Sequence, residues 1–260
     1  MEKFKLDENI VELSPPRKVE MADEWFEVAN TNHFWIRWRF EVLRKYTSTF
    51  LANHGNILEI GCGSGVVMNQ FEQLLNKVID GCDLNLYALK RIKNANGKKY
   101  VYNIFDLNEG MVGRYDTVIL LDVVEHIEND LEFLFAARKH AKVGGYVVIN
   151  VPAMNSLFSR YDEQAGHQRR YTKKMLKVLC EQAGLDVISI QYWGFSLIPV
   201  AIIRKVLLLV VASDSIIEIG FKPPSAWINK MFQLLMKVEL FLVKSPPVGT
   251  SLFAVAKIRD

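Results

Sequence analysis

"ILEIGCGSGVV", residues Ile57 to Val67, places three glycines within five positions directly after an apolar run. A β-rich run, a glycine-rich turn and a helical segment, in that order, bring backbone N–H groups and a helix N-terminus against a ligand. The dinucleotide pattern G-x-G-x-x-G needs a third glycine where this chain has Val66. The Gly-Lys-Ser/Thr of a phosphate loop is missing as well. The stretch therefore predicts a ligand site of neither phosphate-binding type.

Downstream of Asn56, short β-rich runs alternate with helical segments, which is typical of a parallel sheet with crossover helices. The run "YDTVILLD" is nearly continuous in apolar residues, as expected for a strand that is buried on both faces. Thr172 is a typical N-cap and Gly184 a typical helix end. The predicted strands are residues 56–60, 77–83, 99–105, 115–122, 145–152, 185–193 and 250–258, and the predicted helices are 66–76, 85–95, 129–141 and 172–184.

The composition is that of a globular chain with one domain and an insertion. It has 260 residues, of which 50% are hydrophobic, and a formal net charge of +3. This charge is too small to indicate nucleic-acid binding by itself. Cys62, Cys82 and Cys180 are odd in number and lack metal-type spacing, so we expect reduced core thiols in a cytoplasmic protein.

The sequence predicts neither a secretory signal nor a transmembrane helix. The N-terminus shows no positively charged segment followed by an apolar one, so it does not predict a secretory signal. The longest apolar stretch, residues 195–212, is interrupted at its centre by Arg204 and Lys205. Two adjacent cations at mid-bilayer are costly, so this stretch does not predict a transmembrane helix.

"LEIGCGSG" resembles motif I, E/D-x-G-x-G-x-G, of the class I S-adenosylmethionine-dependent methyltransferases. The resemblance continues through Asp83 after the second strand, "IFDLNE" after the third and "LLDVVEH" at the fourth. It runs from about His33 to Gly184 and again over the last strand. It implies an α/β, Rossmann-like, seven-stranded methyltransferase sheet whose last strand is antiparallel, with S-adenosylmethionine as the cofactor.

The same resemblance implies a set of cofactor-binding residues. Asp83 is expected at the ribose hydroxyls and Asp106 at the adenine amino group. Glu59 is expected to order the glycine loop and to approach the methionine ammonium group indirectly. "NHFWIRWR" is similar to an N-terminal cap over the cofactor in a bacterial subgroup, with Trp35 and Arg39 as candidates. The complete predicted set is Trp35, Arg39, Glu59, Gly61, Cys62, Gly63, Gly65, Asp83, Leu84, Asp106, Leu107, Leu121 and Asp122.

Methyl transfer chiefly requires positioning, but an oxygen or nitrogen acceptor must also lose a proton. Asp122, Glu125 and His126 follow the fourth strand, at the sheet edge where ligands bind. Their D-x-x-E-H pattern is similar to the E-x-x-E-H of two metal-assisted branches, the ubiquinone O-methyltransferases and the small-RNA 2′-O-methyltransferases. His167 occupies the place of a further histidine ligand in the RNA branch.

Three interpretations of this cluster remain open: a divalent-cation site, a proton-handling cluster without metal, and local packing. We predict that no metal is used, that His167 is the base or orients the acceptor, and that His126 and Glu125 are further catalytic candidates. "GHQRRYT" resembles a loop that lies as a lid over the active site in the bacterial subgroup. Arg169 and Arg170 there are either a solvated helix start or ligands of an anionic acceptor.

Between the last two predicted strands lies an apolar insertion. Its segment 228–244 places Ile228, Met231, Phe232, Leu235, Val238 and Leu242 at helical spacing. The insertion is either a helical subdomain or homodimer interface, or a cover for an apolar or lipid-linked acceptor that contacts a membrane surface through residues 195–244. "PPVGTSLFAVAK" again matches the bacterial subgroup.

We therefore predict four parts: a helical cap at 1–50, a cofactor-binding core at 51–192, the insertion at 193–249 and the final strand at 250–260. The predicted activity is S-adenosylmethionine-dependent O- or N-methylation of a small or lipid-like acceptor. The alternatives are a metal-assisted O-methyltransferase of quinone or RNA type, and a cofactor-binding protein without transfer activity. The near-neutral charge argues against a nucleic-acid partner. We expect a cytoplasmic protein, with peripheral membrane contact as the alternative.

Overall fold

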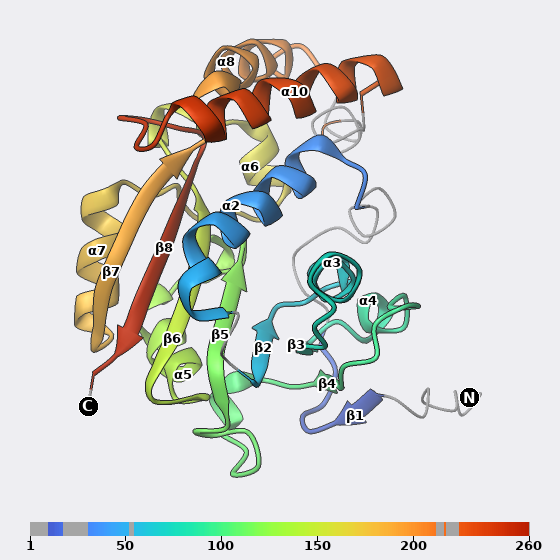
Figure 1. Ribbon diagram of the computed structural model, residues 1–260, viewed down its shortest axis with the longest axis vertical. Helices are drawn as coiled ribbons and strands as arrows, with labels where there is room; N and C mark the ends of the chain where they lie inside the picture. Colours follow the sequence, from blue (N-terminus) through green and yellow to red (C-terminus); the bar gives the residue numbers. More distant parts are fainter. Residues whose placement is uncertain (1–9, 18–30, 52–54, 212–215, 217–223, 260) are drawn as a thin grey trace.

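The computed structural model describes residues 10–17, 31–51, 55–211, 216 and 224–259. Within these ranges, strands alternate with helices along most of the chain (Figure 1). The strands are β1 (Ile10–Glu12), β2 (Ile57–Ile60), β3 (Asp80–Asp83), β4 (Lys99–Val101), β5 (Tyr115–Leu121), β6 (Ala141–Pro152), β7 (Leu185–Trp193) and β8 (Ser251–Ile258). The helices are α2 (Phe34–Leu51), α3 (Val66–Leu75), α4 (Leu86–Leu89), α5 (Asp130–Arg138), α6 (Arg160–Gln164), α7 (Lys173–Gln182), α8 (Ile198–Leu207) and α10 (Ala226–Leu242), with short 3-10 turns η1 (Ile104–Asp106), η2 (Val124–His126), η3 (Asn155–Leu157) and η4 (Phe195–Leu197).

All described strands form one sheet in the order β1-β4-β3-β2-β5-β6-β8-β7. Seven of them run parallel, and β8 is inserted antiparallel between β6 and β7. The chain order therefore reverses direction between β2 and β5, and loops after these strands lie at one edge of the sheet. An open α/β sheet binds its ligands at such a switch point. The predicted α/β fold with an antiparallel last strand is confirmed.

The prediction of seven strands is wrong by one. The additional strand β1 pairs in parallel with β4, in the register Ile10 to Lys99. It has three residues, and only Ile10 among them is buried. A short edge strand with one buried side chain carries almost no alternation of apolar and polar residues, so the sequence pattern could not reveal it.

Two layers of helices cover the sheet because β5 is apolar toward both faces. Val118 and Leu120 belong to a core shared with α5 and α7, whereas Ile119 and Leu121 belong to a core shared with α2, α3 and α4. All four side chains are at most 5% exposed. The buried strand and its two covering layers fix the positions of the loops at the carboxyl end of the sheet.

Helices α8 and α10 lie at the end of the molecule to which the parallel strands point, and α2 runs from there across one face of the sheet (Figure 1). Helix α2 packs on the sheet through Trp38, whose ring lies 5.4 Å from that of Trp193. Parts of the predicted cap, 1–9 and 18–30, and parts of the predicted insertion, 212–215 and 217–223, lie outside the described residues. Nowhere in the described chain is a helix both long and apolar enough to cross a membrane.

Candidate functional site

The glycine loop joins β2 to α3 and turns sharply under the end of β5. Gly61 has a φ of 75°, and a Cβ atom there would lie 2.5 Å from a methyl carbon of Val123. Gly65 has a φ of 70° and serves helix packing, because its Cβ atom would lie 2.8 Å from Ile92. Left-handed φ values and close approach both favour glycine at these two positions.

A cavity of about 400 Å³ opens beside this loop, at the carboxyl ends of β2, β3 and β5. Most of the predicted cofactor residues line it. They are Arg39, Glu59, Gly61, Cys62, Gly63, Asp83, Leu84, Leu121 and Asp122. We call this space the donor cavity.

Asp83 is held in place by backbone groups of the two loops on either side of it. Its Oδ2 atom accepts a hydrogen bond of 2.8 Å from the Gly63 N–H, and its Oδ1 atom accepts one of 2.8 Å from the Asn85 N–H. Burial raises the pKa of Asp83, and these backbone hydrogen bonds offset part of that effect. Each oxygen keeps a second lone pair, so the carboxylate can accept hydrogen bonds from a ligand's hydroxyl groups.

Two further carboxyls line the inner end of the donor cavity. Asp122 adopts a φ of 58° and forms a salt bridge with Arg39 of α2. Its Oδ1 atom accepts a 2.7 Å hydrogen bond from the amide of Asn150. Glu59 is 3% exposed, and burial raises its pKa to about 8 although Arg39 opposes this shift. The Oε2 atom of Glu59 has no hydrogen-bond partner among the described residues.

Four predicted cofactor residues lie outside the lining of the donor cavity. The carboxylate of Asp106 accepts hydrogen bonds from Ser14 and Asn103. Leu107 follows in the left-handed conformation, with a φ of 43°, and ends η1. Gly65 packs on Ile92, as described above, and Trp35 lines a different cavity.

Sequence reasoning missed one part of the lining of the donor cavity. Asn103, Ile104, Phe105 and Phe133 form it. The first three immediately precede Asp106, so the motif "IFDLNE" marked the correct loop but pointed to its acid rather than to its apolar residues. Phe133 comes from α5 and carries no sequence signal for this site.

A second cavity, of about 390 Å³, lies on the other side of Asp122 and His126, and these two residues line both cavities. Its far walls are apolar and come largely from α8, α2 and α10. They include Phe34, Trp35, Leu197, Val200, Ala201, Ile203, Leu207, Leu208 and Phe232. The polar lining includes Glu125, His126 and His167 at the shared end, and also His33 before α2 and Arg204 on α8. We call this space the acceptor cavity.

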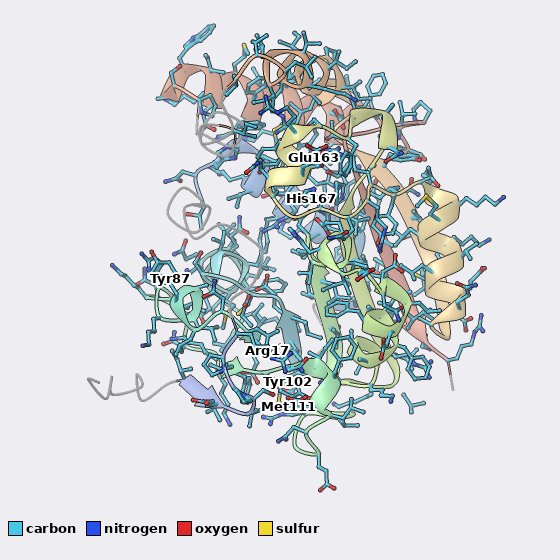
Figure 2. All side chains as sticks on the ribbon, turned by 180° about the vertical axis from the view of Figure 1, so that it is seen from behind. Arg17, Tyr87, Tyr102, Met111, Glu163 and His167 are labelled. Atoms are coloured by element: carbon cyan, nitrogen blue, oxygen red, sulfur yellow. The ribbon has the colours of Figure 1, made fainter. Side chains whose placement is uncertain are left out.

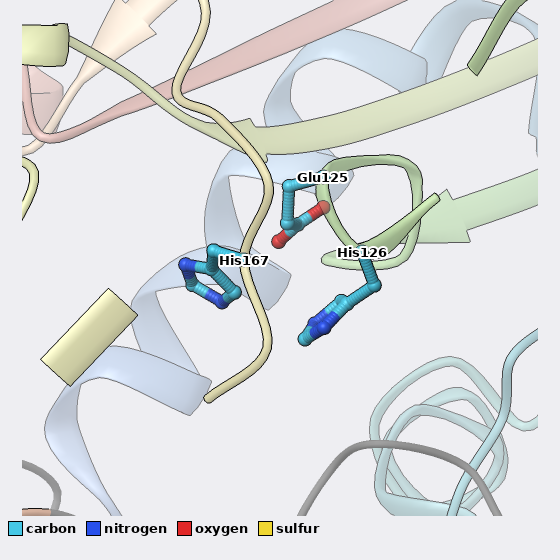
Figure 3. A group of neighbouring side chains, drawn as sticks. All are labelled: Glu125, His126 and His167. Atoms are coloured by element: carbon cyan, nitrogen blue, oxygen red, sulfur yellow. The ribbon is translucent and has the colours of Figure 1, made fainter. Parts of the chain in front are cut away.

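Glu125, His126 and His167 meet at that shared end (Figure 3). One potential ligand atom from each of the three lies within 4.8 Å of the others. Glu125 is fully buried, and burial, followed by the charge of Asp122, raises its pKa well above the usual range. Burial and the neighbouring His167 lower the pKa of His126 to about 3, so its ring is neutral. Neither oxygen of Glu125 has a hydrogen-bond partner in the described part of the chain.

His167 lies in the loop after α6, toward the end of the molecule that carries α8 and α10 (Figure 2). Its Nδ1 atom is 2.9 Å from Oδ1 of Asp162, which is fully buried. Burial alone would raise the pKa of Asp162, but hydrogen bonds from His167 and the charge of Arg170 lower it to about 2. The ionised carboxylate can only accept, so Nδ1 of His167 donates in this contact, and in the neutral form of the ring the lone pair is then on Nε2.

The two arginines of the lid are engaged by the protein itself. Arg170 donates from Nε to Asp162 at 2.9 Å. Arg169 donates to the backbone oxygens of Ile127 and Glu128, each at 2.8 Å. The Arg169 contacts fasten the lid to the loop after β5, whereas the Arg170 contact ties the lid to α6. Together they hold the chain on both sides of His167.

A family model described as a methyltransferase domain matches residues 35–190. Among curated proteins, the chain is 33% identical over 99 residues to a ubiquinone biosynthesis O-methyltransferase from Rickettsia conorii. That match spans 36% of this chain and 34% of the relative's length.

The chain belongs to the methyltransferase domain family.

Solved structures of this fold include a SAM-dependent methyltransferase from Archaeoglobus fulgidus, with a TM-score of 0.53 and 17% identity over 85% of this chain and 94% of that chain. Another is the phosphoethanolamine N-methyltransferase 2 of Haemonchus contortus in complex with S-adenosyl-L-methionine, with a TM-score of 0.56 and 15% identity over 86% of this chain and 53% of that chain. The predicted class I methyltransferase family and fold are therefore confirmed. The methyltransferase domain match ends within β7, so α8 and α10 lie outside it.

Proposed function

We propose that this protein transfers a methyl group from S-adenosylmethionine to a hydroxyl oxygen of a small or lipid-like acceptor. The observation that carries the proposal is the meeting of the donor and acceptor cavities at Asp122 and His126. A direct displacement requires two substrates to meet at one point, in a fixed orientation and away from water.

When bound, S-adenosylmethionine supplies a methyl group that is activated by its sulfonium sulfur. The residues of the donor cavity fit this cofactor. We assign Asp83 to the ribose hydroxyls, because its carboxylate is oriented by two backbone N–H groups and has lone pairs to spare. We assign Glu59 and Asp122 to the ammonium end, since the buried Oε2 atom of Glu59 lacks a partner among described residues and lies in the cavity wall.

The adenine ring is assigned to the apolar wall formed by Ile104, Phe105 and Phe133. An aromatic ring stacks favourably on such side chains. Asp106 is assigned an indirect role, because it is absent from the cavity lining and its carboxylate accepts a hydrogen bond from Asn103, which does line the cavity. Arg39 orients Asp122 through their salt bridge.

An oxygen acceptor is supported by the relative from R. conorii, whose name specifies O-methylation in ubiquinone biosynthesis. Much of the acceptor cavity is lined by apolar side chains of α8, with Arg204 and His33 as polar groups beyond the end that it shares with the donor cavity. Its volume of about 390 Å³ lies within the range of small-molecule sites. These features favour a hydroxyl group on a ring that carries an apolar substituent.

We assign proton removal to Nε2 of His167. Asp162 fixes the ring by accepting the Nδ1 proton at 2.9 Å and stabilises the positive charge that the ring gains. Because the pKa of Asp162 is about 2, this carboxylate stays ionised through the neutral range. The neutral ring of His126 is placed to hydrogen-bond the acceptor at the junction of the cavities.

The test is turnover of the His167→Ala variant with labelled methyl donor and an alkyl-substituted catechol. We expect turnover to fall by about 10²-fold or more, with donor affinity in calorimetric titration unchanged. Gln168→Ala is the matched control, since this neighbouring lid side chain is exposed and is absent from the lining of both cavities. Full activity of His167→Ala would remove His167 from the mechanism.

A second candidate function, metal-assisted O-methylation, is favoured by the close approach of Glu125, His126 and His167. A carboxylate and two imidazoles are suitable ligands for a divalent cation. Dialysis against a chelator separates the two candidates. The metal-free proposal expects unchanged turnover, and a loss that Mg²⁺, Mn²⁺ or Zn²⁺ restores would establish the metal-assisted one.

A further inference from the structure

Helix α10 presents an apolar face to the outside of the molecule. Trp227, Met231, Leu234, Val238 and Phe241 follow one another at intervals of four and three residues, so they lie along one face. All five side chains are exposed, Trp227 by 73% and Phe241 by 83%. The opposite face contacts α2, and Met236 and Glu239 are the buried residues of the helix. The outward face is therefore distinct from the face that holds α10 to the protein.

Helix α8 is apolar as well, yet none of its residues is buried. Val200, Ile203 and Leu207 line the acceptor cavity and are also exposed. Ile202 and Val206, one turn apart, are 49% and 59% exposed. Helices α8 and α10 lie at the same end of the molecule (Figure 1), and residues of both line the acceptor cavity. We call their exposed apolar side chains the apolar surface of α8 and α10. An apolar surface of this extent marks an interaction site.

Within the described residues of the insertion, the exposed charges have one sign. Lys230 and Lys237 are exposed and seven residues apart, along one border of the apolar face of α10, and the exposed Lys244 follows just after the helix. Across residues 194–211 and 224–250, the described acidic side chain is that of Glu239, which is 6% exposed and faces inward. Its oxygens accept hydrogen bonds from the backbone of Gly194 and Ser196. The exposed charge is thus positive.

The apolar surface and the positive charge beside it together indicate the kind of partner. A second copy of the chain that packed on this face across a two-fold axis would place its row of lysines beside that of the first copy. The like charges would then repel each other. An anionic bilayer matches both features, because acyl chains cover the apolar face while the lysines reach the headgroups. The exposed side chains of Val200, Ile203 and Leu207 connect this surface directly with the acceptor cavity.

We propose that the apolar surface of α8 and α10 docks on an anionic lipid bilayer, so that an apolar acceptor enters the acceptor cavity from the lipid. The route of the acceptor rests on the proposed function, whereas the docking itself does not. Docking would place α10 in the plane of the membrane, with its stripe from Trp227 to Phe241 facing the acyl chains.

The experiment is flotation of the full chain with vesicles of phosphatidylcholine alone or of equal parts phosphatidylcholine and phosphatidylglycerol. We expect the protein to float with the anionic vesicles. Its fluorescence should be quenched by brominated acyl chains, and Trp227→Phe should lose that quenching while it still floats. Leu234→Glu combined with Phe241→Glu should weaken partitioning at least tenfold. Replacing Lys230, Lys237 and Lys244 by Gln should weaken it roughly fivefold per lysine.

Val143→Glu is the matched control, because Val143 is 75% exposed near the amino end of β6, away from α8 and α10. This variant should float like the unaltered protein. A folded protein that stays in solution with anionic vesicles would overturn the proposal. So would a dimer in light scattering that Phe241→Glu converts to a monomer, since a second copy would then cover the surface. Flotation needs neither donor nor acceptor. A protein that fails to float would therefore contradict the docking proposal without contradicting the proposed methyl transfer.

Discussion

Glu59 and Asp162 are both buried carboxyls, yet their surroundings move their pKa values in opposite directions. Burial raises the pKa of Glu59 to about 8. For Asp162, burial is outweighed by hydrogen bonds from His167 and by the charge of Arg170, and the pKa falls to about 2. At neutral pH, Glu59 therefore carries a proton and Asp162 a negative charge. Carboxyls with divergent pKa values take different roles in one site.

Donor binding should depend on pH through Glu59. The cofactor's ammonium group favours the ionised carboxylate, so binding releases a proton, and the dissociation constant should fall as the pH rises toward about 8. Calorimetric titration in buffers of different ionisation enthalpy measures this proton release. The isosteric variant Glu59→Gln should bind about tenfold more weakly and without pH dependence near neutrality. Equal proton release in both proteins would contradict the assignment of Glu59.

Residue by residue, the sequence predicted the polar part of the site better than its apolar part. Asp83, Glu59 and Asp122 are recognisable because an acid at the end of a buried strand is unusual and falls within a motif. Phe133 looks like any core residue of an amphipathic helix. Asp162 was missed as well, since only the folded lid brings it 2.9 Å from His167.

At the level of elements, Glu239 joins the two halves of the apolar insertion. Its carboxylate on α10 accepts hydrogen bonds from the N–H groups of Gly194, Phe195 and Ser196 and from the Ser196 hydroxyl. These groups form the start of η4, which leads directly into α8. A negative charge at this position satisfies amides that precede a helix and favours its N-terminus.

Glu239→Gln should lower the free energy of unfolding by about 1.5–3 kcal/mol, because hydrogen bonds to a buried charge are lost. Urea denaturation measures the change. Glu12→Gln is the control, since Glu12 is exposed on β1 at the far edge of the sheet, and it should stay within about 0.5 kcal/mol. Equal midpoints for the two variants would show that Glu239 does not hold the insertion together.

Boundaries of elements were predicted less accurately than their existence. The predicted helix 85–95 ends at Leu89, because Asn96 donates from its backbone N–H to Glu72 and Gly97 lies against the carbonyl of Ile79. The predicted helix 129–141 ends at Arg138, where the His140 carbonyl accepts hydrogen bonds from Arg114 and Tyr115 and the chain enters β6. Such contacts between distant segments decide where an element stops, and local propensity does not contain them.

The predicted helix at α10 was correct, but most of its predicted apolar stripe is not buried in a core. Met231, Leu235, Val238 and Leu242, taken from the sequence as one apolar stripe, are exposed, and Met236 is buried instead. Apolar residues surround most of this helix, so periodicity alone could not choose the side that packs on α2.

At the scale of the whole molecule, polar contacts connect the cap, the sheet and the last parallel strand. Trp193 of β7 donates to Asn150 of β6 at 2.8 Å, Asn150 donates to Asp122 after β5, and Asp122 pairs with Arg39 of α2. The network joins four elements, and two of its members, Arg39 and Asp122, line the donor cavity. A ligand bound there contacts a network that global unfolding must break.

The demethylated cofactor should therefore stabilise the whole chain. At a concentration of 100 times its dissociation constant, the gain is about 2.7 kcal/mol, and the thermal midpoint should rise by several degrees. Asp83→Ala should lose most of this rise. Asp106→Ala should keep most of it, because that carboxylate binds Ser14 and Asn103. Differential scanning calorimetry measures all three, and a comparable rise with a nicotinamide dinucleotide would contradict the proposed cofactor.

Strand β8 is synthesised after all the other strands but lies between β6 and β7 in the sheet. β7 is an edge strand, and its one neighbour in the described sheet is β8, in the register Leu185 to Ile258. A ribosome therefore completes β7, α8 and α10 before the strand that attaches β7 to β6 exists. Until residues 251–258 emerge, the nascent chain can form the sheet from β1 to β6, which lies beside the donor cavity. It cannot yet attach β7 to that sheet. Strand β7 and the exposed apolar helices of the insertion therefore stay unattached to the rest of the sheet until β8 is made, and they are the surfaces that a chaperone would bind in the nascent chain.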